Sequence, residues 1–188
     1  MKHKFIKKLL IFGAVLAVSF VGHPPTSVAA DIELVIGTGN IKGDLFAAGN
    51  AISIASALNG KGFKVYNYGT KGGKDNIKRV TKKKKSINLG MVTAKDLSKA
   101  KAKQIKKLRG LMSLGTLKGK EILLIVRNKA PKKVSKNSYK SSISSVVKLL
   151  NSSKSKVRIK SVWAGYAPKG ASSAFKNVGV KLHSSAMK

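Results

Sequence analysis

The sequence predicts an α/β fold built on a mainly parallel sheet. Short apolar runs typical of buried strands alternate with longer segments whose apolar residues recur at helical spacing. Glycine-rich turns separate the two kinds of segment. Strands that alternate with helices are joined by crossover connections, so they tend to run parallel, with the helices covering the faces of the sheet.

Eight elements are expected up to Arg127, in the order β-α-β-α-β-α-β-β. The first strand is apolar and ends in glycine, and the second alternates with aromatic and β-branched residues. "NGKG" ends the first helix, and Asp75 or Asn76 can cap the second. The strands are expected at residues 32–39, 63–70, 87–93, 108–115 and 121–127, and the helices at residues 45–59, 75–85 and 94–108.

The sequence changes character after Arg127. Residues 128–142 are polar and basic and are interpreted as a linker, and residues 143–153 as a short helix. Residues 157–163 alternate like a strand that buries Trp163, and a glycine turn then leads into another helix. We therefore expect a first α/β lobe over 31–128, and a linker with a partial second lobe over 129–188.

Residues 1–30 have the pattern of a secretory signal peptide. Four lysines precede the apolar core "LLIFGAVLAVSFV", and small residues follow at Val28, Ala29 and Ala30. The apolar core is short for a membrane span, although an uncleaved N-terminal anchor stays an alternative. We expect cleavage near Ala30 and a periplasmic or secreted protein.

The chain is strongly basic and has no cysteine. Residues 1–30 hold four of the 39 basic residues and none of the six acids, which leaves 35 basic residues against six acids, a net charge of +29. Such a charge attracts anionic small molecules, lipid, glycan or nucleic acid, although a lysine-rich surface also serves solubility alone. Without cysteine, a disulfide, a thiolate metal site and a cysteine nucleophile are excluded.

The sequence predicts no enzyme, no cofactor and no metal site. Two of the three histidines, His3 and His23, lie in the expected signal peptide, and His183 is expected at the surface. A single histidine makes neither a serine triad nor a zinc cluster. The six scattered carboxylates offer no close pair for glycoside hydrolysis.

Two glycine-rich turns are the candidate binding motifs. "GTGNIKG" has one residue too many for the dinucleotide fingerprint, and "GTKGGKDN" is not a P-loop. Both turns follow a strand and precede a helix, so their backbone N–H groups suit an oxyanion. The alternative is that the glycines only let the chain reverse sharply.

The lysine runs do not predict a specific nucleic-acid site. Residues 82–85 and 99–107 are rich in lysine but lack interleaved aromatic residues on which bases could stack. Tyr66 and Tyr68 lie on an expected strand, where cross-strand packing is their commoner use. Nonspecific attraction to anionic surfaces is the expectation that remains.

The order of these motifs resembles the TAXI-type substrate-binding proteins of TRAP transporters. "IGTGNIKGDLFAAGNAI" looks like the opening block of that family, with Thr38, Gly39, Gly43 and Gly49 in register. "TKGGKDNIKRV" is similar to its T-G-G-S-x-x-N block. "INLGMVTAKD" and "LRGLMSLGTLKGKEILLIVR" resemble the two following blocks, and "AGYAPKGASSAF" resembles more weakly the turn that opens the second lobe.

The resemblance implies a periplasmic-binding-protein-like lobe that closes on a small carboxylate and passes it to TRAP-type permease subunits. The chain length leaves room for only an incomplete second lobe. Leu45 replaces the family's usual aromatic residue, Gly73 its serine, and Thr93-Ala94 its Gln-Ser pair. The implied ligand-binding residues are Thr38, Gly39, Gly43, Leu45, Thr70, Lys71, Gly72, Gly73, Asn76 and Thr93.

Two alternatives to solute transport stay open. The first is a diverged, shortened member that acts as a secreted basic protein on anionic surfaces or host partners. The second is a remnant of the fold without a ligand. The departures at Leu45 and Gly73 favour these alternatives, whereas the intact order of the blocks favours a solute-binding protein.

Overall fold

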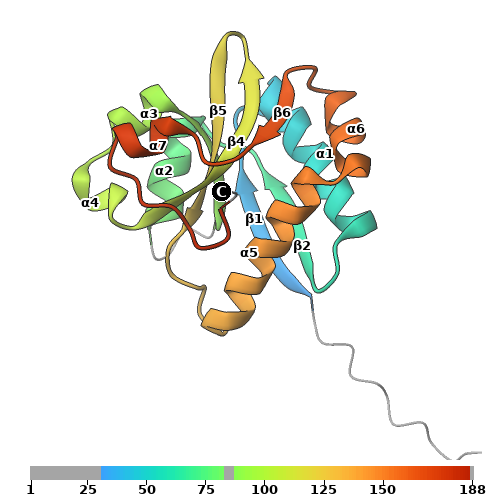
Figure 1. Cartoon of the computed structure of the whole chain (residues 1–188), viewed down its shortest axis with the longest axis horizontal. Coiled ribbons are helices and arrows are strands. Elements are labelled where there is room, and N and C mark those ends of the chain that lie inside the picture. The colour runs from blue at the N-terminus through green and yellow to red at the C-terminus, as the bar shows by residue number, and fades with distance from the viewer. Residues whose placement is uncertain (1–30, 83–86, 187–188) are drawn as a thin grey trace, which may run out of the picture.

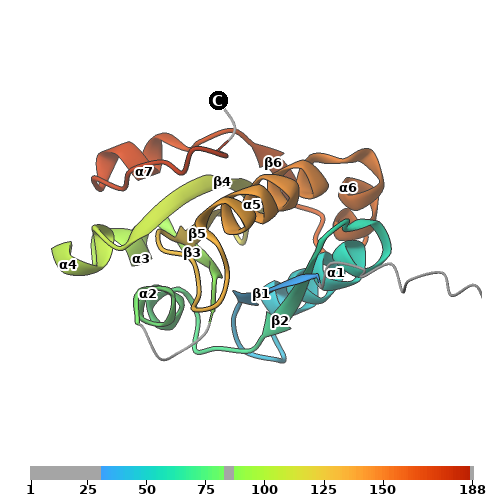
Figure 2. The same cartoon turned by 90° about the horizontal axis from the view of Figure 1, so that it is seen from below.

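The computed structural model describes residues 31–82 and 87–186 and shows a mixed α/β fold. One six-stranded sheet runs through the molecule, with helices on both of its faces (Figures 1 and 2). No helix in these residues combines the length and apolar character that crossing a bilayer needs. The expected signal peptide and the lysines at 83–85 lie outside the described residues.

The expected order of elements is confirmed as far as Arg127, except that two short helices replace the single helix predicted over 94–108. One or two helices separate each strand from the next up to β4, and β5 follows β4 directly in sequence. The strands are β1 Ile32–Gly37, β2 Phe63–Tyr68, β3 Leu89–Thr93, β4 Leu108–Leu117, β5 Lys120–Arg127 and β6 Tyr166–Lys169. The helices are α1 Asp44–Asn59, α2 Gly73–Thr81, α3 Ala94–Ser98, α4 Ala102–Ile105, α5 Lys136–Asn151, α6 Ser153–Lys160 and α7 Ser173–Asn177.

The prediction of a mainly parallel sheet holds for one half of it. The strand order is β2-β1-β3-β5-β4-β6, in which β2, β1 and β3 are parallel and the other three pairs are antiparallel. The cause is the tight connection between β4 and β5, because Lys118 and Gly119 have φ angles of 50° and 71°. Two such residues suit a two-residue hairpin, and a hairpin makes its strands antiparallel.

Two apolar clusters hold the helices on opposite faces of the sheet. Along β5, Ile122 and Leu124 belong to one cluster, whereas Leu123 and Ile125 belong to the other. The first cluster takes residues from α1, α5 and α6, and the second from α2, α3 and α7. The sheet is therefore covered on both faces, as the nearly continuous apolar runs of its strands require.

The segment after Arg127 differs most from the predictions. Ser135 caps α5 by accepting a hydrogen bond from the Ser138 backbone N–H, so this helix begins inside the predicted linker. The strand predicted over 157–163 is wrong, because Ser152 caps the helix α6 there. Of its apolar residues, Ile159 is buried but Val157 is 72% exposed, which is helical rather than strand packing.

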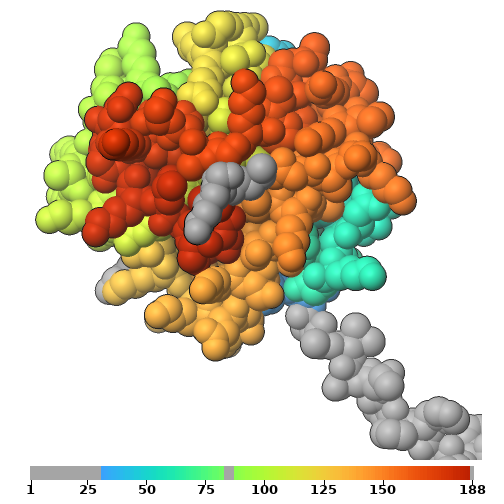
Figure 3. Space-filling view, viewed as in Figure 1, coloured from blue at the N-terminus to red at the C-terminus, as the bar shows by residue number. Residues whose placement is uncertain are grey.

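Strand β6 and helix α5 join the sheet and core formed by the earlier residues. β6 pairs with β4, and Tyr139 and Ile143 of α5 belong to the larger apolar cluster. Trp163 is buried, as predicted, and its indole N–H donates to the Thr116 carbonyl at 2.7 Å. The later segments cover much of one side of the molecule, in orange and red in Figure 3.

Gly115 provides a test of how β4 and the chain before β6 fit together. It has a φ of +123°, and a Cβ there would overlap the Gly165 carbonyl oxygen, whereas Gly119 has a φ of +71° and open space around it. We expect Gly115→Ala to lower the free energy of unfolding by at least about 3 kcal/mol and Gly119→Ala by about 1 kcal/mol. Urea unfolding followed by circular dichroism measures both, and equal losses would contradict the close approach.

Candidate functional site

The predicted binding residues follow the carboxyl ends of the parallel strands. β1 lies between β2 and β3, so the chain leaves β1 toward one neighbour and later returns to the other. The space between β1 and β3 is a topological switch point, where open α/β sheets bind their ligands. Thr38 follows β1, Thr70 follows β2, and Thr93 ends β3.

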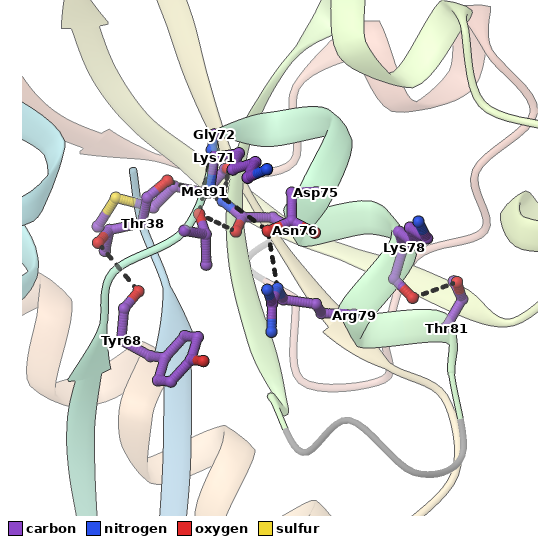
Figure 4. Close-up of polar contacts among 11 residues, drawn as sticks. Thr38, Tyr68, Lys71, Gly72, Asp75, Asn76, Lys78, Arg79, Thr81 and Met91 are labelled. Carbon is purple, nitrogen blue, oxygen red and sulfur yellow. Dashed lines mark hydrogen bonds and ion pairs between the residues drawn. The ribbon is translucent and has the colours of Figure 1, made fainter. Parts of the chain in front are cut away.

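The side chain of Asn76, from α2, lies at this switch point and bonds the groups around it. It is fully buried, and its Nδ2 donates to the backbone oxygens of Thr38 at 2.8 Å and Met91 at 2.7 Å. Its Oδ1 accepts a hydrogen bond from the Thr70 hydroxyl at 2.7 Å. Figure 4 shows these groups converging from β1, β3 and the second glycine turn. One amide therefore links the ends of all three parallel strands.

Thr70 connects the two glycine turns to each other. Its backbone N–H donates to the Gly39 carbonyl at 2.8 Å, and its hydroxyl oxygen accepts from the Gly72 N–H at 3.1 Å. Gly72 has a φ of +95°, which glycine adopts without steric cost. The turns predicted to share a ligand are thus adjacent and mutually fixed.

The Thr38 side chain makes contacts inside the fold and does not reach the surface. It is fully buried and its hydroxyl donates to Asn67 Oδ1 at 2.9 Å. Asn67 in turn donates to the Phe46 carbonyl of α1, and a Cβ at Gly49 would overlap its side chain. The threonine therefore positions α1 against β2. Because its hydroxyl is already engaged, any ligand in this region would meet backbone groups instead.

The first glycine turn joins β1 to α1, and its exposed part is residues 40–42. Gly43 precedes α1 in an extended conformation, and Leu45 is half-buried against the larger apolar cluster. A Cβ at Gly39 would meet only the Leu45 Cβ, at 3.8 Å. Leu45 therefore packs as part of the scaffold, and a methyl group at position 39 would fit without overlap although Gly39 is buried.

Thr93 meets the start of α2 through Asp96. Its hydroxyl and its backbone N–H both donate to Asp96 Oδ2, at 2.7 and 2.9 Å, and the Asp96 N–H donates back to the hydroxyl. This is a capping box for α3. A Cβ at Gly73 would overlap the Asp96 carboxylate. The carboxylate thus gives a packing reason for glycine at position 73.

Lys71 is exposed, and its backbone N–H donates to Asp75 at 3.3 Å. Burial would raise the pKa of the Asp75 carboxyl, but hydrogen bonds from Arg79 and from the Lys71 N–H, with the charges of Arg79 and Lys78, lower it on balance. The Arg79 Nε lies 2.7 Å from Asp75, and its guanidinium stacks over Tyr68 at 5.3 Å. When the Asp75 carboxyl is ionised, this ion pair fixes the first turn of α2.

Several backbone N–H groups at this edge remain without an acceptor. Among the described residues, no hydrogen bond uses the N–H groups of Gly39, Gly73 or Lys74. Gly39 is itself buried, and Gly73 and Lys74 begin α2, where the helix dipole favours negative charge. These groups, rather than the threonine hydroxyls, can hold an oxyanion.

Asn67 and Asp96 were not predicted from the sequence. Both had a signal: asparagine is depleted in strands, so one inside β2 indicates a specific hydrogen bond, and Thr93 followed three residues later by Asp96 has the spacing of a capping box. None of the ten predicted residues lines either the cavity between α2 and α4 or a second cavity between the start of β1 and α5. No group of acidic and histidine side chains in the described part of the chain could hold a metal ion.

Comparison with known proteins identifies no family for this chain. No protein-family model and no curated protein matches it. The resemblance to the TAXI-type proteins therefore stays a prediction that rests on the residues quoted above.

Replacing the Asn76 amide tests its place in the network. Asn76→Asp removes two donors and places a carboxylate against two carbonyl oxygens, so we expect unfolding free energy to fall by at least about 3 kcal/mol at pH 7. Protonation restores one donor, so the deficit should shrink as the pH falls toward 5. Asn40→Asp, at an exposed residue whose Oδ1 accepts from the Lys42 N–H, is the control and should cost under about 0.5 kcal/mol. A small effect at Asn76 in urea unfolding would contradict its role.

The Asp75–Arg79 pair predicts a pH dependence of stability. Because the pKa of Asp75 is lower in the folded state, its carboxylate stabilises the fold at pH values above the ordinary carboxyl pKa of 3.8. This contribution to stability is lost as the pH falls. We expect Asp75→Asn to lower stability by about 0.5–1 kcal/mol at pH 7 and by less at pH 3. Melting temperatures from pH 3 to pH 7 measure this, and a constant deficit would exclude the ion pair as its cause.

Proposed function

We propose that the chain is an exported solute-binding protein that takes a small organic anion, a carboxylate or amino-acid-like molecule. The proposed site lies where the two glycine turns meet at the carboxyl ends of β1 and β2. The observation that carries the proposal is the set of N–H groups without acceptors at Gly39, Gly73 and Lys74 beside the switch point. By its resemblance to TAXI-type proteins, the partner would be a TRAP-type membrane permease.

The fold is compatible with one lobe of a periplasmic-binding-protein type. β1 to β4 all run in one direction, and β5 lies antiparallel between β3 and β4. In such a sheet the turns that follow the strands collect at one edge, where residues far apart in sequence can share a ligand. Asn76 and Thr70 hold the two turns in place and so pre-form the site.

The chemistry of the site favours a carboxylate over a neutral solute. Backbone N–H groups and the start of a helix both carry partial positive charge. The excess of lysine raises the local concentration of anions without selecting among them. Selection then depends on the short-range hydrogen bonds, which salt weakens much less than it weakens attraction between exposed charges.

Calorimetric titration of the purified protein with glutamate and 2-oxoglutarate, at low and high salt, tests this function. We expect saturable one-to-one binding that persists at high salt. Gly39→Ala should weaken it at least about tenfold, because a methyl group would stand beside the turn's N–H groups, while the melting temperature stays unchanged. Heat that appears only at low salt, or unchanged affinity in the variant, would contradict the proposed site.

A further inference from the structure

A cavity lined mainly by lysine side chains lies beside α2. This cavity, of about 350 Å³, is lined by α2 and by the segment that includes α4. Both helices are labelled on the left of Figure 1. Seven lysines line the cavity, among them Lys74 and Lys78 from α2 and Lys99, Lys103 and Lys107 from the facing wall. Ile77 and Ala100 add apolar surface. We call this the lysine groove.

The charge of the lysine groove is almost uncompensated. Asp96 is the one acidic residue in its lining, and its Oδ2 is already engaged by the hydroxyl and N–H of Thr93. None of the seven lysines forms an ion pair with a described residue, and nearby Asp75 is paired with Arg79. The ammonium groups therefore repel one another unless anions from solution lie among them.

The composition of the groove limits what can occupy it. A ligand with a single charge would leave most of the repulsion in place, whereas one with several charges would offset it. Lysine ammoniums act as point charges that suit phosphate groups, and arginine, which would favour bidentate carboxylate recognition, is absent from the lining. The volume is at the small end for ligand sites, and no aromatic lining residue could stack a base.

We propose that the lysine groove binds a compact anion that carries two or more phosphate groups. This site differs from the organic-anion site at the glycine turns: the two meet at Lys74, whose backbone N–H belongs to that site and which also lines the groove, and they share no other residue. Its occupant would draw α2 and α4 together by neutralising the charges on both walls.

Titration of the purified full chain with inorganic tripolyphosphate at physiological salt tests the proposal. The triple variant Lys78→Gln, Lys103→Gln, Lys107→Gln removes three groove charges at exposed positions. The control Lys148→Gln, Lys154→Gln, Lys160→Gln removes three exposed charges from α5 and α6 and leaves the same net charge. We expect the groove variant to bind at least tenfold more weakly and the control less than threefold.

Three results would overturn the proposal. Equal losses in the two variants would mean diffuse attraction to the whole basic surface. An oligonucleotide whose binding depends on the groove but which tripolyphosphate does not displace would mean a nucleic-acid surface instead. Binding of acetate as tightly as tripolyphosphate would remove the need for several charges. The groove variant should bind glutamate like the unmodified protein, so failure here is distinguishable from failure of the proposed solute site.

Discussion

The position of α2 depends on one buried amide. Asn76 donates to carbonyls from β1 and β3 and accepts from Thr70, so it satisfies backbone groups that the switch in strand order leaves unpaired. A buried polar group is costly unless all its partners are present, which makes the arrangement specific as well as stable. The same amide requires small neighbours: a Cβ at Gly37 would lie 2.6 Å from its Oδ1. Part of the glycine pattern therefore follows from internal packing.

That packing changes the meaning of the glycine turns for function. Their polar side chains, Thr38 and Thr70, are used inside the fold, as is the amide of Asn76. Side chains that are already hydrogen-bonded position a site but contribute little direct contact to a ligand. What the turns leave unpaired is backbone, at Gly39 and at the start of α2. A site made of N–H groups recognises negative charge well and the rest of a ligand poorly, so specificity would have to come from the surrounding surface.

The sequence predicted the parts of the fold that local patterns determine. Apolar runs, glycine turns and helical spacing located every strand and the first two helices up to Arg127, and the alternation of types predicted the parallel half of the sheet. The single helix predicted over 94–108 is two short helices, α3 and α4. The antiparallel hairpin at Lys118 and Gly119 was not predicted, because a lysine with positive φ has no clear signal in the sequence. Helix α6 was predicted as a strand, because apolar residues alternate over too few positions in 157–163 to distinguish the two. The ten site residues were predicted through the resemblance, but the burial of Thr38, Thr70 and Asn76 depends on contacts far apart in sequence. Thr38 meets Asn67, and Asn76 meets Met91, through pairings that no local pattern encodes.

The excess positive charge limits how this fold can be stabilised. Only three ion pairs form among the described residues, and two of them, at Asp31 and Asp44, are exposed and contribute little. Apolar clusters on both faces of the sheet must therefore oppose the mutual repulsion of many lysines. Any anion that binds the folded chain more tightly than the unfolded one relieves this repulsion and stabilises the fold. For so basic a protein, binding an anion and maintaining the fold are thermodynamically linked, whichever of the two proposed anion-binding sites is occupied.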